Sequence, residues 1–154
     1  MDRRDIFGLL AAAVAMTAGS RAQAAGEQAA GAKKHRLALH VDQSDIAQMN
    51  LALGNASNVI EHYKSRGEDV AIEIVTYAQG LHMLREDTSP VKERIKSLRE
   101  KMPAVAFSVC DNTRRRMEKE EGRKLVFLPE AAIVPSGVVR LMELQEQGWS
   151  YVRP

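Results

Sequence analysis

The single cysteine of this sequence, Cys110, stands where an apolar run gives way to polar residues. The run at 104–109 reads A-V-A-F-S-V, and Asp111, Asn112 and Thr113 follow the cysteine. This pattern predicts a buried parallel strand that ends and turns into a helix. Chemistry gathers at the carboxyl ends of such strands, and the N–H groups at a helix N-terminus favour a thiolate. Cys110 is therefore the candidate nucleophile.

Charges near Cys110 act on its thiol in both directions. The side chains of Arg114 and Arg115 would favour the thiolate, and Asp111 would oppose it. Free cysteine is also among the most buried residue types, so an inert structural cysteine is the alternative to a working thiol.

Cys110 and Arg116 have the C-x5-R spacing of cysteine phosphatase loops, which cradle a phosphate with backbone N–H groups and an arginine. No glycine lies between the two residues and no histidine precedes the cysteine, which disfavours this chemistry. We expect residues 114–116 to form a solvated helix face, balanced by nearby glutamates, with an oligomer contact as the alternative.

Composition narrows the classes of function. The chain has 154 residues, enough for one domain with a core, and a formal net charge of +2. A nearly balanced charge argues against nucleic acid as the main partner. No apolar run is long enough for an internal membrane span.

The first residues read as an export signal. Residues 1–24 combine a pair of arginines, a short apolar stretch at 8–19 and an A-x-A cleavage site at 22–24. The arginine pair suggests twin-arginine export, with a Sec signal or an uncleaved anchor as alternatives. We expect a flexible leader at 25–34, a periplasmic location and no stable membrane insertion after cleavage.

Strands and helices alternate along residues 35–154, which predicts a single α/β domain: a three-layer sandwich with a mostly parallel five-stranded sheet. We expect Ser44 to cap the first helix and Ser89 to cap the second, with Pro90 in its first turn. Gly54 indicates close packing of the first helix on the sheet or, alternatively, room for a ligand or partner helix. The expected strands are 35–41, 69–76, 104–109, 131–134 and 149–152, and the main helices are 45–65, 89–102, 112–121 and 138–147.

Four residues outside the cysteine loop are possible neighbours of Cys110. Tyr77 and His82 follow the second strand, from where His82 could act as a proton relay; an exposed or core-edge histidine is the alternative. Ser136 and Gly137 form a tight turn after the fourth strand.

The histidines do not show the spacing of a metal site. His35 and His40 lie five residues apart on one strand and point to opposite faces. We predict no metal site, although one assembled in three dimensions stays open.

Three blocks of the sequence resemble the DsrE/DsrF-like family, which is linked to sulfur relay. They are 51–58 (LALGNASN), 107–113 (FSVCDNT) and 134–154 (VPSGVVRLMELQEQGWSYVRP). The resemblance implies a flavodoxin-like or Rossmann-like fold, a homo-oligomer (trimer or hexamer) and a cysteine that carries sulfur as a persulfide. Only Cys110 transfers as catalytic, with Asn112 and Thr113 as the cysteine-loop motif and Gly137 as the tail-motif glycine.

The export signal departs from the family, whose known relay members are cytoplasmic, and this leaves the usual partners open. The sequence thus predicts an exported sulfur carrier, similar to sulfurtransferases, that exchanges sulfane sulfur with a thiol or a sulfane-sulfur donor. This hypothesis needs no metal and no organic cofactor. The alternative is a non-catalytic oligomeric binding or accessory module. Trp149 and Tyr151 share one face of the last strand, as core-edge packing or, by the resemblance, as part of a subunit interface.

Overall fold

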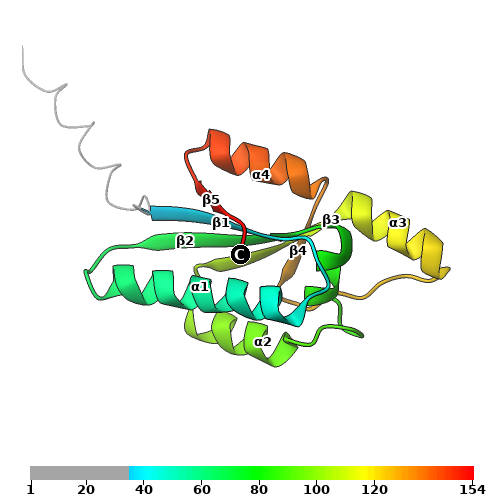
Figure 1. The fold of residues 1–154 in the computed structure, drawn as a ribbon, viewed down its shortest axis with the longest axis horizontal. Coiled ribbons are helices and arrows are strands. Elements are labelled where there is room, and N and C mark those ends of the chain that lie inside the picture. Colours follow the sequence, from blue (N-terminus) through cyan, green and yellow to red (C-terminus); the bar gives the residue numbers. More distant parts are fainter. Residues whose placement is uncertain (1–34) are drawn as a thin grey trace, which may run out of the picture. The chain divides into compact units, whose positions relative to one another are not determined.

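Five parallel strands form one sheet in the order β4-β3-β2-β1-β5 (Figure 1). The structure, a computed structural model, describes residues 35–154. The expected export signal (1–24) and leader (25–34) lie outside the described residues. The strands are β1 (His35–Val41), β2 (Val70–Thr76), β3 (Val105–Cys110), β4 (Ala131–Val134) and β5 (Ser150–Val152).

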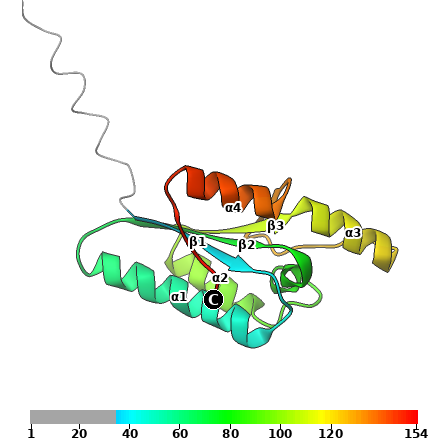
Figure 2. The ribbon, with the colours of Figure 1, turned by 45° about the horizontal axis from the view of Figure 1, so that its top comes forward.

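The helices lie on both faces of the sheet, which gives the three-layer α/β sandwich that the sequence predicts (Figures 1 and 2). In both views α1 and α2 lie on one face and α4 lies on the other, while α3 extends past the carboxyl ends of the strands. The helices are α1 (Ile46–Lys64), a short 3-10 helix η1 (Ala78–Met83), α2 (Lys92–Lys101), α3 (Asp111–Glu121) and α4 (Gly137–Glu146).

The two faces of the sheet bury very different amounts of apolar surface. The larger cluster includes Leu39, Ile72, Phe107 and residues of α1 and α2. Under α4 the buried cluster contains only Ala38, Val75, Leu141 and Leu144. Hydrophobic burial grows with the apolar area removed from water, so apolar packing holds α4 less firmly than it holds α1.

Two of the expected helix N-caps are wrong, by one residue in α1 and by two residues in α2. Asp45, not Ser44, caps α1, and its carboxylate accepts the N–H of Ala47 at 2.9 Å. The second helix begins at Lys92 rather than beside Pro90. The hydroxyl of Ser89 still accepts the N–H of Val91 at 3.3 Å, but it does so in the turn before the helix.

Gly54 does not mark close packing of α1 on the sheet. A Cβ atom at this position would meet only the guanidinium end of Arg94, at 3.7 Å, which is an ordinary contact. The close approach lies instead at Gly80 in η1, where a Cβ would come within 2.1 Å of the backbone oxygen of Val41. Gly80 therefore lets η1 lie directly against the end of β1.

Candidate functional site

Cys110 ends β3 and at the same time caps α3. Its backbone is extended (φ −69°, ψ 115°), and the helical residues begin at Asp111. In the sheet register Cys110 is opposite Val134, the last residue of β4, so the two strands end side by side. The chain after β4 then turns through Ser136 into α4. This topology brings the N-termini of α3 and α4 to the same sulfur atom.

Hydrogen-bond donors from both helices surround the Cys110 sulfur. Burial raises the pKa of the thiol, but the backbone N–H groups of Gly137, Thr113 and Asn112 and the Thr113 hydroxyl bond to the sulfur and together hold the pKa below its ordinary value. These donors favour the anion because the N–H groups at a helix N-terminus have no partners within the helix and carry the positive end of the dipole. The site is therefore built for a thiolate.

Gly137 is the point at which α4 meets the cysteine. A Cβ atom there would lie 3.1 Å from the Cβ of Tyr77 and 3.2 Å from the Cβ of Cys110. Both of these atoms are fixed to backbone, so a larger residue could enter only if the elements moved apart. The absence of a side chain lets the N–H of Gly137 approach the sulfur, and it places Tyr77 against the same turn.

Thr113 ties the end of β2 to the cysteine loop. Its hydroxyl oxygen accepts the N–H of Ala78 at 3.1 Å, and the hydroxyl donates toward the Cys110 sulfur. Ala78 has a φ of +46°, in the left-handed region that is unfavourable for residues other than glycine. This strained turn is held next to the sulfur, where it fixes the position of Tyr77.

The sulfur has little contact with solvent. Cys110 is 4% exposed. A groove of about 560 Å³ runs beside the cysteine loop without including Cys110 among its walls. It is lined by Asp111, Asn112, Arg114, Arg115, Ile133, Pro135 and Ser136. Asp111 and Asn112, which follow the cysteine, thus line the groove, while Cys110 itself is buried beside them.

The DsrE/DsrF-like family matches residues 38–154 of this sequence. The chain belongs to this family. The match runs from β1 to the last residue and so includes the cysteine loop and the turn at Gly137. Membership indicates a role in sulfur relay at the level of the family.

A solved structure supports the same assignment. This DsrE/DsrF-like chain is 30% identical to a protein of unknown function from Methanobacterium thermoautotrophicum, with a TM-score of 0.66. The likeness covers 78% of this chain and 99% of the other. No curated protein sequence matches the chain.

The three arginines of this DsrE/DsrF-like protein that follow the cysteine do not point to the sulfur. Arg114 pairs with Glu118 at 3.0 Å and also binds Asp111. Arg115 binds Asp111 and the side chain of Asn112. Asp111 is therefore neutralised locally, and it is the N–H groups, not the arginines, that favour the thiolate.

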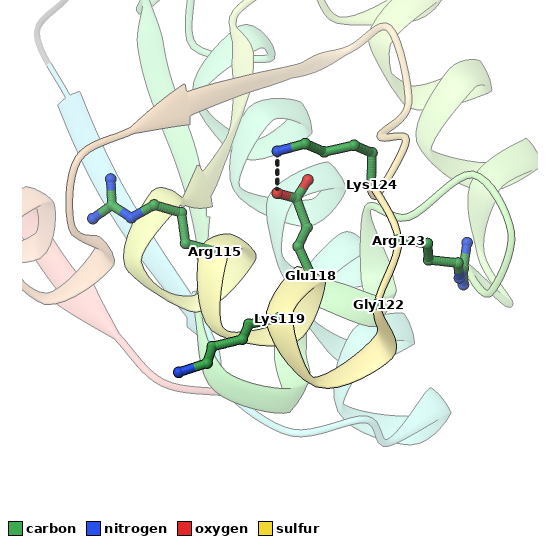
Figure 3. A pocket seen from close by; sticks show the side chains of 6 residues that line it. All are labelled: Arg115, Glu118, Lys119, Gly122, Arg123 and Lys124. Carbon is green, nitrogen blue, oxygen red and sulfur yellow. Dashed lines mark hydrogen bonds and ion pairs between the residues drawn. The ribbon is translucent and has the colours of Figure 1, made fainter.

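Further charged residues surround a groove of about 450 Å³ on the surface, at the C-terminal end of α3. Figure 3 shows Lys124 directed onto the carboxylate of Glu118, 3.0 Å away, while Lys119 points outward. Arg123 pairs with Glu121 at 2.8 Å. Arg116 is exposed and lies 3.7 Å from Glu120. This is the solvated, charge-balanced helix face that the sequence predicts, without a phosphate-clamping arginine.

Of the predicted neighbours, Tyr77 and Gly137 lie at the cysteine and His82 does not. The His82 ring bonds to the hydroxyl of Thr88 at 2.8 Å. Burial lowers the pKa of His82, and Arg85 lowers it further. His82 sits in η1 among these groups, so its expected role as a proton relay for Cys110 has no contact to support it.

The histidine that contacts Tyr77 is His40, not His82. The His40 ring stacks on Tyr77 with ring centroids 4.5 Å apart, and its Nδ1 bonds to the Tyr151 hydroxyl at 2.9 Å. Burial lowers the pKa of His40. Tyr151 lies on the edge strand β5 and is 41% exposed, whereas Trp149 packs against the small cluster beneath α4.

Three polar residues on the α4 face of the sheet were not predicted from the sequence. There Glu73 accepts hydrogen bonds from both Ser108 and Arg140, and Glu73 and Ser108 are each 4% exposed. The available signal was the glutamate in the apolar strand sequence V-A-I-E-I-V-T, because a carboxylate inside a buried strand needs a partner.

Within residues 35–154, no three His, Cys, Asp or Glu side chains gather as a metal site would require. No helix in the same range is long and apolar enough to cross a membrane.

Proposed function

We propose that this protein is an exported, homo-oligomeric carrier that takes up sulfane sulfur on Cys110 as a persulfide and passes it to another thiol. The observation that carries the proposal is the convergence of the α3 and α4 N-termini on one cysteine sulfur whose pKa is lowered. A thiolate at the operating pH is the attacking species in sulfur exchange.

The uptake step conserves atoms and electrons. The Cys110 thiolate attacks the outer sulfur of a persulfide or polysulfide donor, a new S–S bond forms, and the S–S bond of the donor breaks. The bonding electron pair leaves on the donor sulfur, which becomes a thiolate if the donor is a persulfide or a shorter polysulfide anion if the donor is a polysulfide.

In the release step an acceptor thiolate attacks the outer sulfur and Cys110 is the leaving group. A leaving thiol with a low pKa departs faster, so the same N–H groups of Gly137, Asn112 and Thr113 assist both steps.

One observation favours a second candidate, an accessory module whose cysteine does no chemistry. Cys110 is only 4% exposed, as expected for a structural cysteine. The two candidates differ in whether the folded protein accepts sulfur.

Mass spectrometry of the intact protein after incubation with polysulfide tests the proposal. We expect the folded protein to gain sulfur and Cys110→Ser to gain none. A folded protein that stays unmodified, with a thiol that reacts only after unfolding in urea, would contradict the carrier and support the accessory module.

The proposed export can be tested separately, by measuring the mass of the mature protein. Cleavage after Ala24 would leave a mature chain beginning at Ala25. The mass of the protein recovered from the periplasmic fraction gives this end directly, and recovery of the full-length chain from the cytoplasm would refute export.

A further inference from the structure

A buried carboxylate lies on the sheet face beneath α4. Glu73 is in the middle of β2 and is 4% exposed. Its neighbours Ile72 and Ile74 point to the opposite face, into the large core cluster. Isolated buried carboxylates are strongly unfavourable, so the bonds that Glu73 makes decide its role.

Both oxygens of Glu73 are bound by the same guanidinium. Arg140 Nε donates to Oε1 at 2.8 Å, and Arg140 Nη2 donates to Oε2 at 2.7 Å. The Ser108 hydroxyl donates to Oε1 at 2.6 Å. Two parallel N–H···O bonds between arginine and carboxylate fix orientation as well as distance, which a single charge contact does not. We call Glu73, Ser108 and Arg140 the α4 clamp.

The α4 clamp acts on the first turn of α4. Arg140 is three residues after Gly137, and its own N–H bonds to the Ser136 oxygen at 2.9 Å. The guanidinium is thus joined through one helical turn to the N–H that meets the Cys110 sulfur. Because only Leu141 and Leu144 of α4 enter the small cluster beneath it, apolar packing leaves the position of this turn weakly determined.

We propose that the α4 clamp is a positioning device, which keeps the first turn of α4 where the Gly137 N–H reaches the sulfur of Cys110. Glu73, Ser108 and Arg140 touch no reacting atom in this arrangement. Their effect passes through the backbone of α4. The proposal rests on the proposed function in one respect: it takes the Cys110 thiolate to be the group that accepts sulfur.

Two substitutions separate positioning from simple charge. Arg140→Lys keeps the positive charge but cannot form the bidentate pair of hydrogen bonds with the Glu73 carboxylate. Glu73→Gln removes a negative charge, which by electrostatics alone would lower the pKa of Cys110. If the clamp positions α4, both substitutions instead raise this pKa, because the Gly137 N–H moves away from the sulfur.

The experiment follows the thiolate absorbance of the purified protein against pH, with Cys110→Ser as the blank. We expect each variant to raise the pKa of Cys110 by about half a unit, which lowers the ratio of thiolate to thiol about threefold at any given pH. The matched control is Arg94→Lys on the other face, where Arg94 binds Asn50 through its backbone and side-chain oxygens at 3.1 and 2.6 Å. This control should leave the titration unchanged.

The outcomes are distinct. An unchanged titration in folded Arg140→Lys, or a lowered pKa in Glu73→Gln, would overturn the positioning role. If Arg140→Lys does not fold, Glu73→Gln alone decides, because the two mechanisms predict opposite signs for it. The titration requires no sulfur donor. A raised pKa in both variants of a protein that takes up no sulfur would therefore retain the clamp and reject the proposed function.

Discussion

At the scale of single residues, the lowered pKa of Cys110 links the site to stability. The folded state favours the thiolate, so the unfolded chain binds more protons between the lowered pKa and the ordinary value of about 8.5. The site contributes stability in its thiolate form, and this contribution is lost as the pH falls through the folded pKa.

The first prediction follows from this direction of the pH dependence of stability. The free energy of unfolding of the protein, relative to that of Cys110→Ser, should increase as the pH rises from about 6 to about 9. Urea unfolding under reducing conditions at several pH values measures the difference. A difference that falls over this range would mean that the folded state prefers the neutral thiol.

A second prediction concerns the glycine against the sulfur. Gly137→Ala places a methyl group 3.1 Å from Tyr77 and 3.2 Å from Cys110. The N-terminus of α4 must retreat, so we expect a raised Cys110 pKa and a loss of about 1–3 kcal/mol in stability. Thiolate absorbance and urea unfolding measure the two effects. Gly54→Ala is the matched control, because a Cβ there would make one ordinary contact at 3.7 Å; a Gly137→Ala protein that behaves like it would refute the close approach.

At the scale of elements, β1, β2 and β3 could be predicted from the sequence because each is rich in aliphatic residues and is bounded by polar segments. The parallel order and the three layers follow from the alternation of strands and helices, and the structure confirms both. The cap of α1 could not be predicted, since Ser44 and Asp45 are both good N-cap residues and only the backbone geometry chooses between them.

In the candidate site, too, some residues could be predicted from the sequence and others could not. Cys110, Asn112 and Thr113 lie together in the sequence, so a local pattern points to them. The pair Glu73 and Arg140 is separated by 67 residues, and its pairing depends on where α4 crosses the sheet. No period or motif in a single sequence contains that information.

The third prediction contrasts two glycines in different elements. At Gly80 a Cβ would overlap the backbone of Val41 at 2.1 Å, whereas at Gly54 it would make one ordinary contact. Gly80→Ala should therefore destabilise the protein by at least about 3 kcal/mol. Gly54→Ala should stabilise it by about 0.5–1 kcal/mol, because alanine is the better residue inside a helix. Thermal and urea unfolding compare the two variants, and equal effects would contradict the packing of η1 on β1.

At the scale of the whole described domain, exposed apolar side chains gather beside the site. β4 is an edge strand, and Ile133 on it is 57% exposed. On α4, Val138, Val139 and Met142 are 49–54% exposed. Exposed apolar patches and open strand edges are typical of protein interfaces. They support the proposed homo-oligomer, with a second copy of the chain as the occupant.

The fourth prediction tests this surface. Ile133→Lys should shift the protein to a smaller species in sedimentation velocity, because a charge would be buried in the interface. Leu51→Lys on α1 is the matched control, since Leu51 is also about half exposed (51%) but belongs to a helix that packs on β1 and β2 rather than on β4. A wild-type monomer, or equal dissociation by both variants, would exclude the proposed interface.

The burial of Cys110 carries a kinetic consequence. With 4% of the residue exposed, a donor molecule can reach the sulfur only when the surrounding elements move aside. If that opening is slower than the exchange itself, the loading rate will level off at high donor concentration, at a value that does not depend on which donor is used. The same cover would lengthen the lifetime of a loaded sulfur in the presence of reductants, so retention and slow uptake would have one structural origin.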